Sequence, residues 1–181
     1  GLVGMILTMT MVLFTAIALV RERERGNLEM LIATPLSPWE VTLGKILPFI
    51  AIGIIQTTLV LLLGELLFDV PLRGSLVDLY LAAIVFITAN LALGILISTL
   101  ARTQFQAMQM SFFLFLPQIL LSGFMFPYAG MPVAAQYVAE ILPLTHFLRL
   151  VRGIMLRGAT LAELWHSLAA LGAFVTVVLV I

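Results

Sequence analysis

The sequence predicts an all-α fold, a polytopic helical membrane protein with about five transmembrane helices. Hydrophobic residues make up 62% of its 181 residues and charged residues only 10%, whereas a globular domain is about half apolar and a quarter charged. Five apolar stretches are long enough, at about 1.5 Å per residue, to cross a hydrocarbon core of about 30 Å. The stretches are residues 2–20, 46–68, 79–100, about 108–126 and 164–181.

Charge balance and the absence of cysteine exclude several classes of function. Nine basic and nine acidic residues cancel, and no Lys/Arg-rich run is present, so we expect no nucleic-acid partner. Without cysteine the chain has no disulfide, no thiolate nucleophile and no Cys-ligated metal site. The phosphate-binding pattern G-x-x-x-x-G-K-[ST] is also absent, so this chain does not hydrolyse ATP through a P-loop.

A charged connection follows the first apolar stretch, and we call it the elbow (residues 21–45). Gly26 interrupts the first helix, and Asn27 is a suitable N-cap for a short helix over residues 28–34. Glu29 lies near the positive end of that helix, and Pro35 ends it. A connection between two spans needs only a few residues, so a structured elbow favours recognition by a partner.

The second span is preceded by a strong helix-start signal. Ser37 and Glu40 have the spacing of a capping box, with Pro38 at the first helical position. We therefore expect the next helix to begin at residue 37 or 38. Lys45, at the end of the elbow, lies early in this helix.

Polar residues at mid-depth of the second and third spans are our candidates for lining a pathway. Asn90 and Gly94 are four residues apart and share a helix face, which favours close helix packing over a substrate contact. Polar residues are tolerated inside a span where neighbouring helices supply partners. The candidates are Gln56, Thr57 and Asn90.

The fourth span is followed by apolar sequence too long for one crossing. Residues 103–139 contain no charge, and prolines divide this run, so we expect a re-entrant helical hairpin on the side opposite the elbow, buried against protein. In its second arm, polar residues recur every three positions opposite apolar ones, which predicts an interfacial amphipathic helix. The residues assigned to this hairpin are Pro127, Pro132, Pro143, His146, Arg149 and Arg152.

We expect no metal ligands and no catalytic residues. Glu140 and His146 are the nearest approach to a metal or proton site, but their spacing matches no ligand motif. Basic residues number five on the elbow side and four on the other side, which favours a cytoplasmic elbow.

Several sequence blocks carry a family resemblance. The elbow reads E-R-E-R-G-N-L-E-M-L-I-A-T-P-L-S-P-W-E over residues 22–40 and continues to Gly44 and Lys45. Later blocks read L-S-G-F-M-F-P (121–127), L-P-L-T-H-F (142–147) and R-G-I-M-L-R-G (152–158). Together they resemble the permease subunits of type-2 ATP-binding-cassette (ABC) transporters of the multidrug or export type. Asn27 stands where that family usually has threonine, and either residue is an N-cap.

The resemblance implies a membrane permease subunit of an ATP-driven ABC exporter, not an enzyme. Residues 1–181 would form one transmembrane domain, spans two to six of a six-span permease, in a bacterial inner (plasma) membrane. Its partners would be an ABC ATP-binding subunit, a second permease copy or homologue, and membrane lipid, with ATP and magnesium held on the ATPase. The short elbow helix would be the coupling helix. Its residues are Glu24, Arg25, Gly26, Asn27, Leu28, Glu29, Leu31, Thr34 and Pro35.

An alternative is a secondary transporter or channel subunit without an ATPase partner. Such proteins usually carry intramembrane charges or broken helices at an ion site. The predicted spans contain only Glu65, close to a span end. The exported substrate, and the choice between a homodimer and a heterodimer, are not indicated by any residue pattern.

Overall fold

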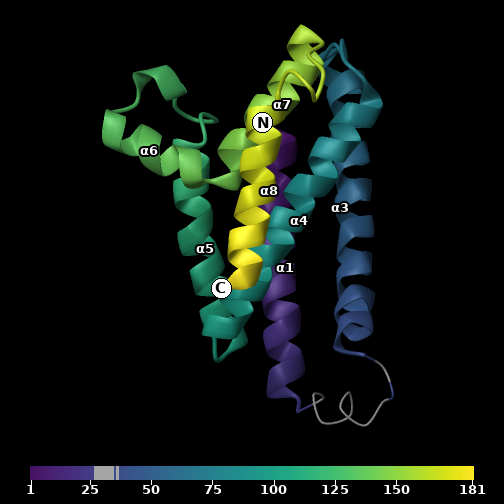
Figure 1. Cartoon of the computed structure of the whole chain (residues 1–181), viewed down its shortest axis with the longest axis vertical. Coiled ribbons are helices and arrows are strands. Elements are labelled where there is room, and N and C mark those ends of the chain that lie inside the picture. Colours follow the sequence, from purple (N-terminus) through teal and green to yellow (C-terminus); the bar gives the residue numbers. More distant parts are fainter. Residues whose placement is uncertain (27–34, 36) are drawn as a thin grey trace.

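The computed structural model describes residues 1–26, 35 and 37–181, and in this part of the chain the regular structure is entirely helical (Figure 1). The predicted all-α class is confirmed. The elements are α1 (Leu2–Glu24), α3 (Pro38–Phe68), α4 (Leu76–Leu100), α5 (Gln104–Leu121), the 3-10 turn η1 (Tyr128–Gly130), α6 (Val133–Ile141), α7 (Pro143–Arg157) and α8 (Trp165–Val180).

Three helices among the described residues are long and apolar enough to cross a membrane, namely α1, α3 from Glu40 onward, and α4. They correspond to the first three predicted spans. The predicted fifth span is α8, an apolar helix of 16 residues. The predicted fourth span is α5, whose 18 residues include four glutamines. These lower its hydropathy, so the expected number of five spans is not confirmed.

The predicted start of the second span is confirmed in detail. Ser37 caps α3: its hydroxyl oxygen accepts the backbone N–H of Glu40 at 3.4 Å, and the Glu40 carboxylate accepts the Ser37 N–H at 2.8 Å. Pro38 occupies the first turn, where its missing N–H costs nothing. The helix then continues past Pro48 to Phe68 without interruption.

The fourth helix differs from its predicted boundaries of 108–126. It begins at Gln104, because the Thr103 hydroxyl accepts the Gln106 N–H at 3.2 Å and caps the helix. It ends at Leu121, since Gly123 adopts a left-handed backbone with φ of 85° shortly afterwards.

The main core lies where α1, α4, α7 and α8 pack together. Fully buried side chains from these helices include Met11, Phe86, Phe147 and Leu171. The rings of Phe86 and Phe147 are stacked with centroids 4.1 Å apart. This contact fixes α7 of the predicted hairpin against the long helix α4.

A second buried cluster joins α1, α4 and α5 nearer the elbow. Here α1 and α4 approach so closely that a Cβ atom added to Gly94 would lie 2.7 Å from the Cβ of Thr15 and 3.1 Å from the Val12 carbonyl. The close packing predicted for the Asn90–Gly94 face is therefore confirmed.

The chain has two distinct ends, which we call the elbow end and the far end (Figure 1). The C-terminus of α1 and the N-terminus of α3 lie at the elbow end, whereas α6 and the C-terminus of α7 lie at the far end. At the far end the connection before α4 is joined to α7, because the Arg73 N–H donates to the Met155 carbonyl at 3.1 Å. Gly158, with φ of 68°, ends α7 beside that connection.

Candidate functional site

The described part of the elbow begins at the C-terminus of α1, where backbone hydrogen bonds define the end of the helix. The Arg25 N–H donates to the Arg21 carbonyl at 3.1 Å, and the Gly26 N–H donates to the Arg23 carbonyl at 3.2 Å. Gly26 adopts φ of 69°, a left-handed conformation that ends the helix. The prediction that Gly26 interrupts the helix is confirmed.

Most of the predicted coupling residues lie outside the described part of the chain. These are Asn27, Leu28, Glu29, Leu31 and Thr34, together with the short helix predicted over residues 28–34. Glu24, Arg25, Gly26 and Pro35 are described, and all four are exposed. The coupling role of the set stays a prediction.

An ion pair connects the two helices that flank the elbow. The Lys45 ammonium of α3 donates to the Glu22 carboxylate of α1. Both side chains are partly buried, with 27% and 37% exposure, so solvent screens this pair less than it screens a fully exposed one. The two residues are 23 positions apart, and sequence spacing alone gave no signal for this contact.

A second glutamate connects α1 to α5. The Glu24 carboxylate accepts the backbone N–H of Gln104 at 3.2 Å and the Gln104 side-chain amide at 2.6 Å. Gln104 is the first residue of α5, and its partner lies 80 positions earlier in the chain. The last turn of α1, which we call the base of the elbow, therefore contacts two other helices: α3 through Glu22 and α5 through Glu24.

The three pathway candidates are placed differently from one another. The Thr10 hydroxyl lies 2.9 Å from the Gln56 side-chain carbonyl, so Gln56 links α3 to α1. Thr57 is buried and bonds the Gly53 carbonyl within its own helix. Asn90 is fully buried and donates to the Phe86 carbonyl at 3.0 Å. Thr57 and Asn90 thus lie in helix packing within this chain, and the pathway role stays a prediction.

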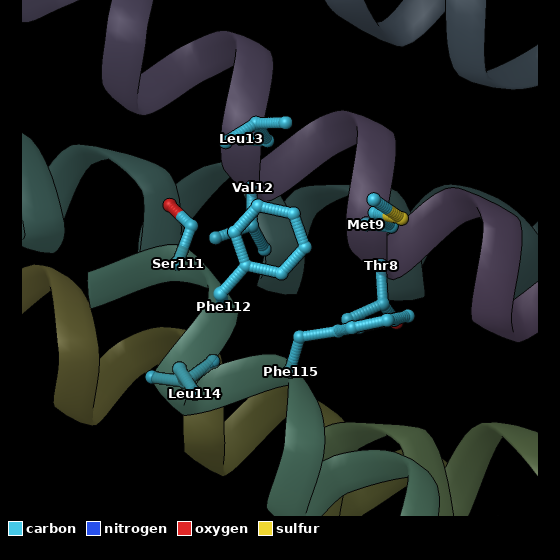
Figure 2. Close-up of a pocket in the computed structure, with 8 residues that line it drawn as sticks. All are labelled: Thr8, Met9, Val12, Leu13, Ser111, Phe112, Leu114 and Phe115. Carbon is cyan, nitrogen blue, oxygen red and sulfur yellow. The ribbon is translucent and has the colours of Figure 1, made fainter. Parts of the chain in front are cut away.

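A shallow apolar groove lies between α1 and α5, where Phe112 extends toward α1 and Phe115 lies beside Thr8 (Figure 2). Its two hydroxyl groups are satisfied within their own helices: Thr8 donates to the Gly4 carbonyl and Ser111 to the Ala107 carbonyl, each at 2.8 Å. The groove therefore presents an almost wholly apolar surface. It is lined by Thr8, Met9, Val12, Leu13, Ser111, Phe112, Leu114 and Phe115.

At the far end, three side chains form a contact that we call the clasp (Tyr128, Glu140 and Arg149). The Arg149 guanidinium donates to both carboxylate oxygens of Glu140, at 2.5 and 3.0 Å. The Tyr128 hydroxyl donates to the same carboxylate at 2.6 Å, and the guanidinium lies 4.8 Å from the Tyr128 ring centroid. The clasp joins η1 and α6 to α7.

The electrostatics of the clasp follow from this geometry. Arg149 beside Glu140 holds the pKa of that carboxyl down from its ordinary value of 4.5 to about 2. The hydrogen bond to the Glu140 carboxylate raises the pKa of Tyr128, and the carboxylate in turn raises the pKa of Arg149. The clasp is therefore a charged pair at neutral pH.

The remaining hairpin residues have separate contacts. His146 is buried and its Nε2 lies 2.7 Å from the Glu140 carbonyl, while Arg152 donates to the Gly123 carbonyl at 3.0 Å. Pro132 and Pro143 stand at the starts of α6 and α7, and Pro127 precedes η1. His146 therefore packs inside the protein, whereas Arg149 is half-buried and Arg152 is exposed, and the interfacial position of the hairpin stays a prediction.

Acidic and histidine side chains do not gather into a metal site anywhere in the described ranges of the chain. From the sequence we considered Glu140 only as a metal or proton ligand and did not predict the contacts of its carboxylate with Tyr128 and Arg149. The signal available in the sequence was the presence of opposite charges on neighbouring short helices.

Comparisons with known proteins agree on one family. A family model described as ABC-2 type transporter matches residues 1–156. The chain is 36% identical over 168 residues to the Probable multidrug ABC transporter permease YbhR of Escherichia coli strain K12, which covers 93% of this chain and 46% of that protein. It is 35% identical over 159 residues to the Probable multidrug ABC transporter permease YbhS of the same strain, covering 87% and 42%. It is 32% identical over 179 residues to that strain's Inner membrane transport permease YhhJ, covering 96% and 48%.

The chain spans about half the length of these curated relatives. No solved structure matches it.

Proposed function

We propose, from the premise that this chain belongs to the ABC-2 type transporter family, that it acts as a permease subunit of an ATP-driven exporter. It would form part of the translocation pathway in a bacterial inner membrane, as a dimer with a second permease. A separate ATP-binding subunit would supply ATP hydrolysis and hold ATP and magnesium. The elbow would lie on the cytoplasmic side and contact that subunit.

This proposal rests on the contacts made by the last turn of α1. Glu22 forms an ion pair with Lys45 of α3, and Glu24 accepts two hydrogen bonds from Gln104 of α5. A push on the elbow by a partner would therefore be transmitted to three helices together. Coupling requires two states that differ in their contacts with the partner, and a base rigidly bonded to the membrane helices allows such a difference to reach the pathway.

The alternative, a secondary transporter or channel, gains no support from the described residues. Glu65 lies near the end of α3 and is exposed, and the described acidic and histidine side chains form no ion-binding cluster.

The proposal is tested with one cysteine, because the chain contains none of its own. A Phe112→Cys substitution places a thiol in the groove, at a position that is 42% exposed. The rate at which a membrane-permeant maleimide labels this thiol is measured in membranes containing the whole transporter, with and without ATP. We call this the groove-labelling assay. The proposal expects ATP to change the labelling rate.

A Gly26→Val substitution should abolish that change while ATP hydrolysis continues. Among the described residues, nothing lies within 4 Å of a Cβ placed on Gly26. Its φ of 69° strains a β-branched residue by about 1–2 kcal/mol or more. Gly172→Val is the control, because Gly172 also has open space around it but lies within the ordinary helix α8. An unaltered ATP response in Gly26→Val would count against coupling through the elbow.

A further inference from the structure

We infer that Glu24 and Gln104 are positioning residues that transmit movement of the elbow directly to α5, and thereby to a wall of the groove. This inference rests on the proposed function. It assigns the transmission to the hydrogen bonds between the end of α1 and the start of α5.

The geometry of the bond suits transmission of a displacement. Gln104 is the first residue of α5, and the backbone N–H groups of a first helical turn have no partner within the helix. The Glu24 carboxylate accepts that N–H at 3.2 Å and the Gln104 amide at 2.6 Å. A negative charge at a helix N-terminus also interacts favourably with the helix dipole. Glu24 thus caps α5 from another helix with two charge-assisted hydrogen bonds.

The position of Glu24 on α1 separates its role from that of Glu22. Residues two positions apart on a helix point about 200° apart, so the two glutamates face opposite sides of α1. Glu22 bonds Lys45 of α3 on one side, and Glu24 bonds Gln104 of α5 on the other. Gly26, where the helix ends in a left-handed conformation, follows two residues after Glu24. A displacement of the elbow therefore reaches Glu24 within one helical turn.

The helices that this bond joins are the two walls of the groove. Val12 and Ala16 of α1 and Ala107 of α5 belong to one buried cluster, so the helices are packed together above the bond. The groove that contains Phe112 and Phe115 lies between α1 and α5 next to that cluster, and Val12 belongs to both (Figure 2). Because the bond joins the elbow end of α1 to the elbow end of α5, movement of the elbow reaches both walls and changes the groove between them.

The test is a charge exchange read by the groove-labelling assay. Gln104→Glu places two carboxylates against each other and should reduce the effect of ATP on the labelling rate by about twofold to fivefold, as expected for a charged contact that is exposed to solvent. The double variant Glu24→Gln with Gln104→Glu restores one donor and one carboxylate to the pair, so it should recover the ATP effect. Gln106→Ala is the control, since the Gln106 side chain accepts the nearby Arg102 N–H at 2.9 Å and is bonded to no other helix among the described residues.

The outcomes distinguish this inference from the proposed function. Loss in Gln104→Glu and recovery in the double variant, with Gln106→Ala unchanged, support the inference. An ATP effect that persists in Gln104→Glu, or that stays lost in the double variant although it inserts and binds the ATPase, overturns the inference and leaves the proposed function standing. No ATP effect in the Phe112→Cys parent overturns both.

Discussion

Replacing Glu140 by glutamine should weaken the clasp that holds α6 against α7. The substitution removes the charge that accepts both guanidinium N–H groups of Arg149 and the hydroxyl of Tyr128. A pKa difference between 4.5 and about 2 corresponds to about 3 kcal/mol without screening. The Glu140 side chain is 41% exposed, so solvent screening reduces the expected loss to about 1 kcal/mol.

The contribution of the clasp should depend on pH in a defined direction. The pKa of Glu140 is lower in the closed hairpin than in an opened one, so its stabilisation is complete above about pH 4.5 and is lost as pH falls toward 2. Between neutral pH and about pH 3, the difference between the parent chain and Glu140→Gln should shrink by more than half.

Hydrogen exchange of the α6 amides measures this local opening directly. At neutral pH the α6 amides of Glu140→Gln should exchange about fivefold faster than those of the parent, as 1 kcal/mol implies. Glu163→Gln makes the same chemical change on an exposed residue between α7 and α8, and should leave α6 unaffected. Equal α6 exchange in Glu140→Gln and the parent, or an equal effect of both substitutions, would refute the assignment of the clasp.

Three further substitutions test the packing and the ion pairs. Gly94→Val should destabilise the α1–α4 contact by about 1–3 kcal/mol, since its Cβ would lie 2.7 Å from that of Thr15; thermal unfolding in detergent checks this, and an unchanged midpoint would contradict it. Arg149→Lys should lose most of the clasp, because an ammonium cannot form the bidentate pair; α6 exchange as slow as in the parent would contradict this. Lys45→Gln should weaken the contact between α3 and α1 by up to about 1 kcal/mol of stability. Glu22→Gln should have the same effect, and the double variant should be no less stable than either single variant. Additive losses would show that the two residues act separately.

Local signals in the sequence were sufficient for most helix ends. The capping box of Ser37 and the break at Gly26 appear where they were expected, because both depend on the nearest backbone groups. The fourth helix was misplaced because two such signals were overlooked. Thr103 followed by Gln106 is a capping pattern, and Gly123 marks the helix end more closely than the later prolines do.

The contacts that make the candidate site could not be predicted from one sequence. Glu24 and Gln104 are 80 positions apart, and their bond exists only because α1 and α5 pack side by side. The polar periodicity of α7 also predicted the wrong environment for one residue. His146 lies on the expected polar stripe, yet it is buried against the end of α6 because helices cover more than one face of α7.

Binding of an ATPase to the elbow is tested directly by cross-linking. Single substitutions Leu28→Cys and Leu31→Cys would be cross-linked in membranes containing the whole transporter, and the captured protein identified, with Tyr137→Cys at the far end as control. We expect both elbow cysteines, and not the control, to capture a P-loop ATPase with a yield that changes with ATP. Capture of only lipid or a second copy of this chain would contradict this expectation and would favour the secondary-transporter alternative.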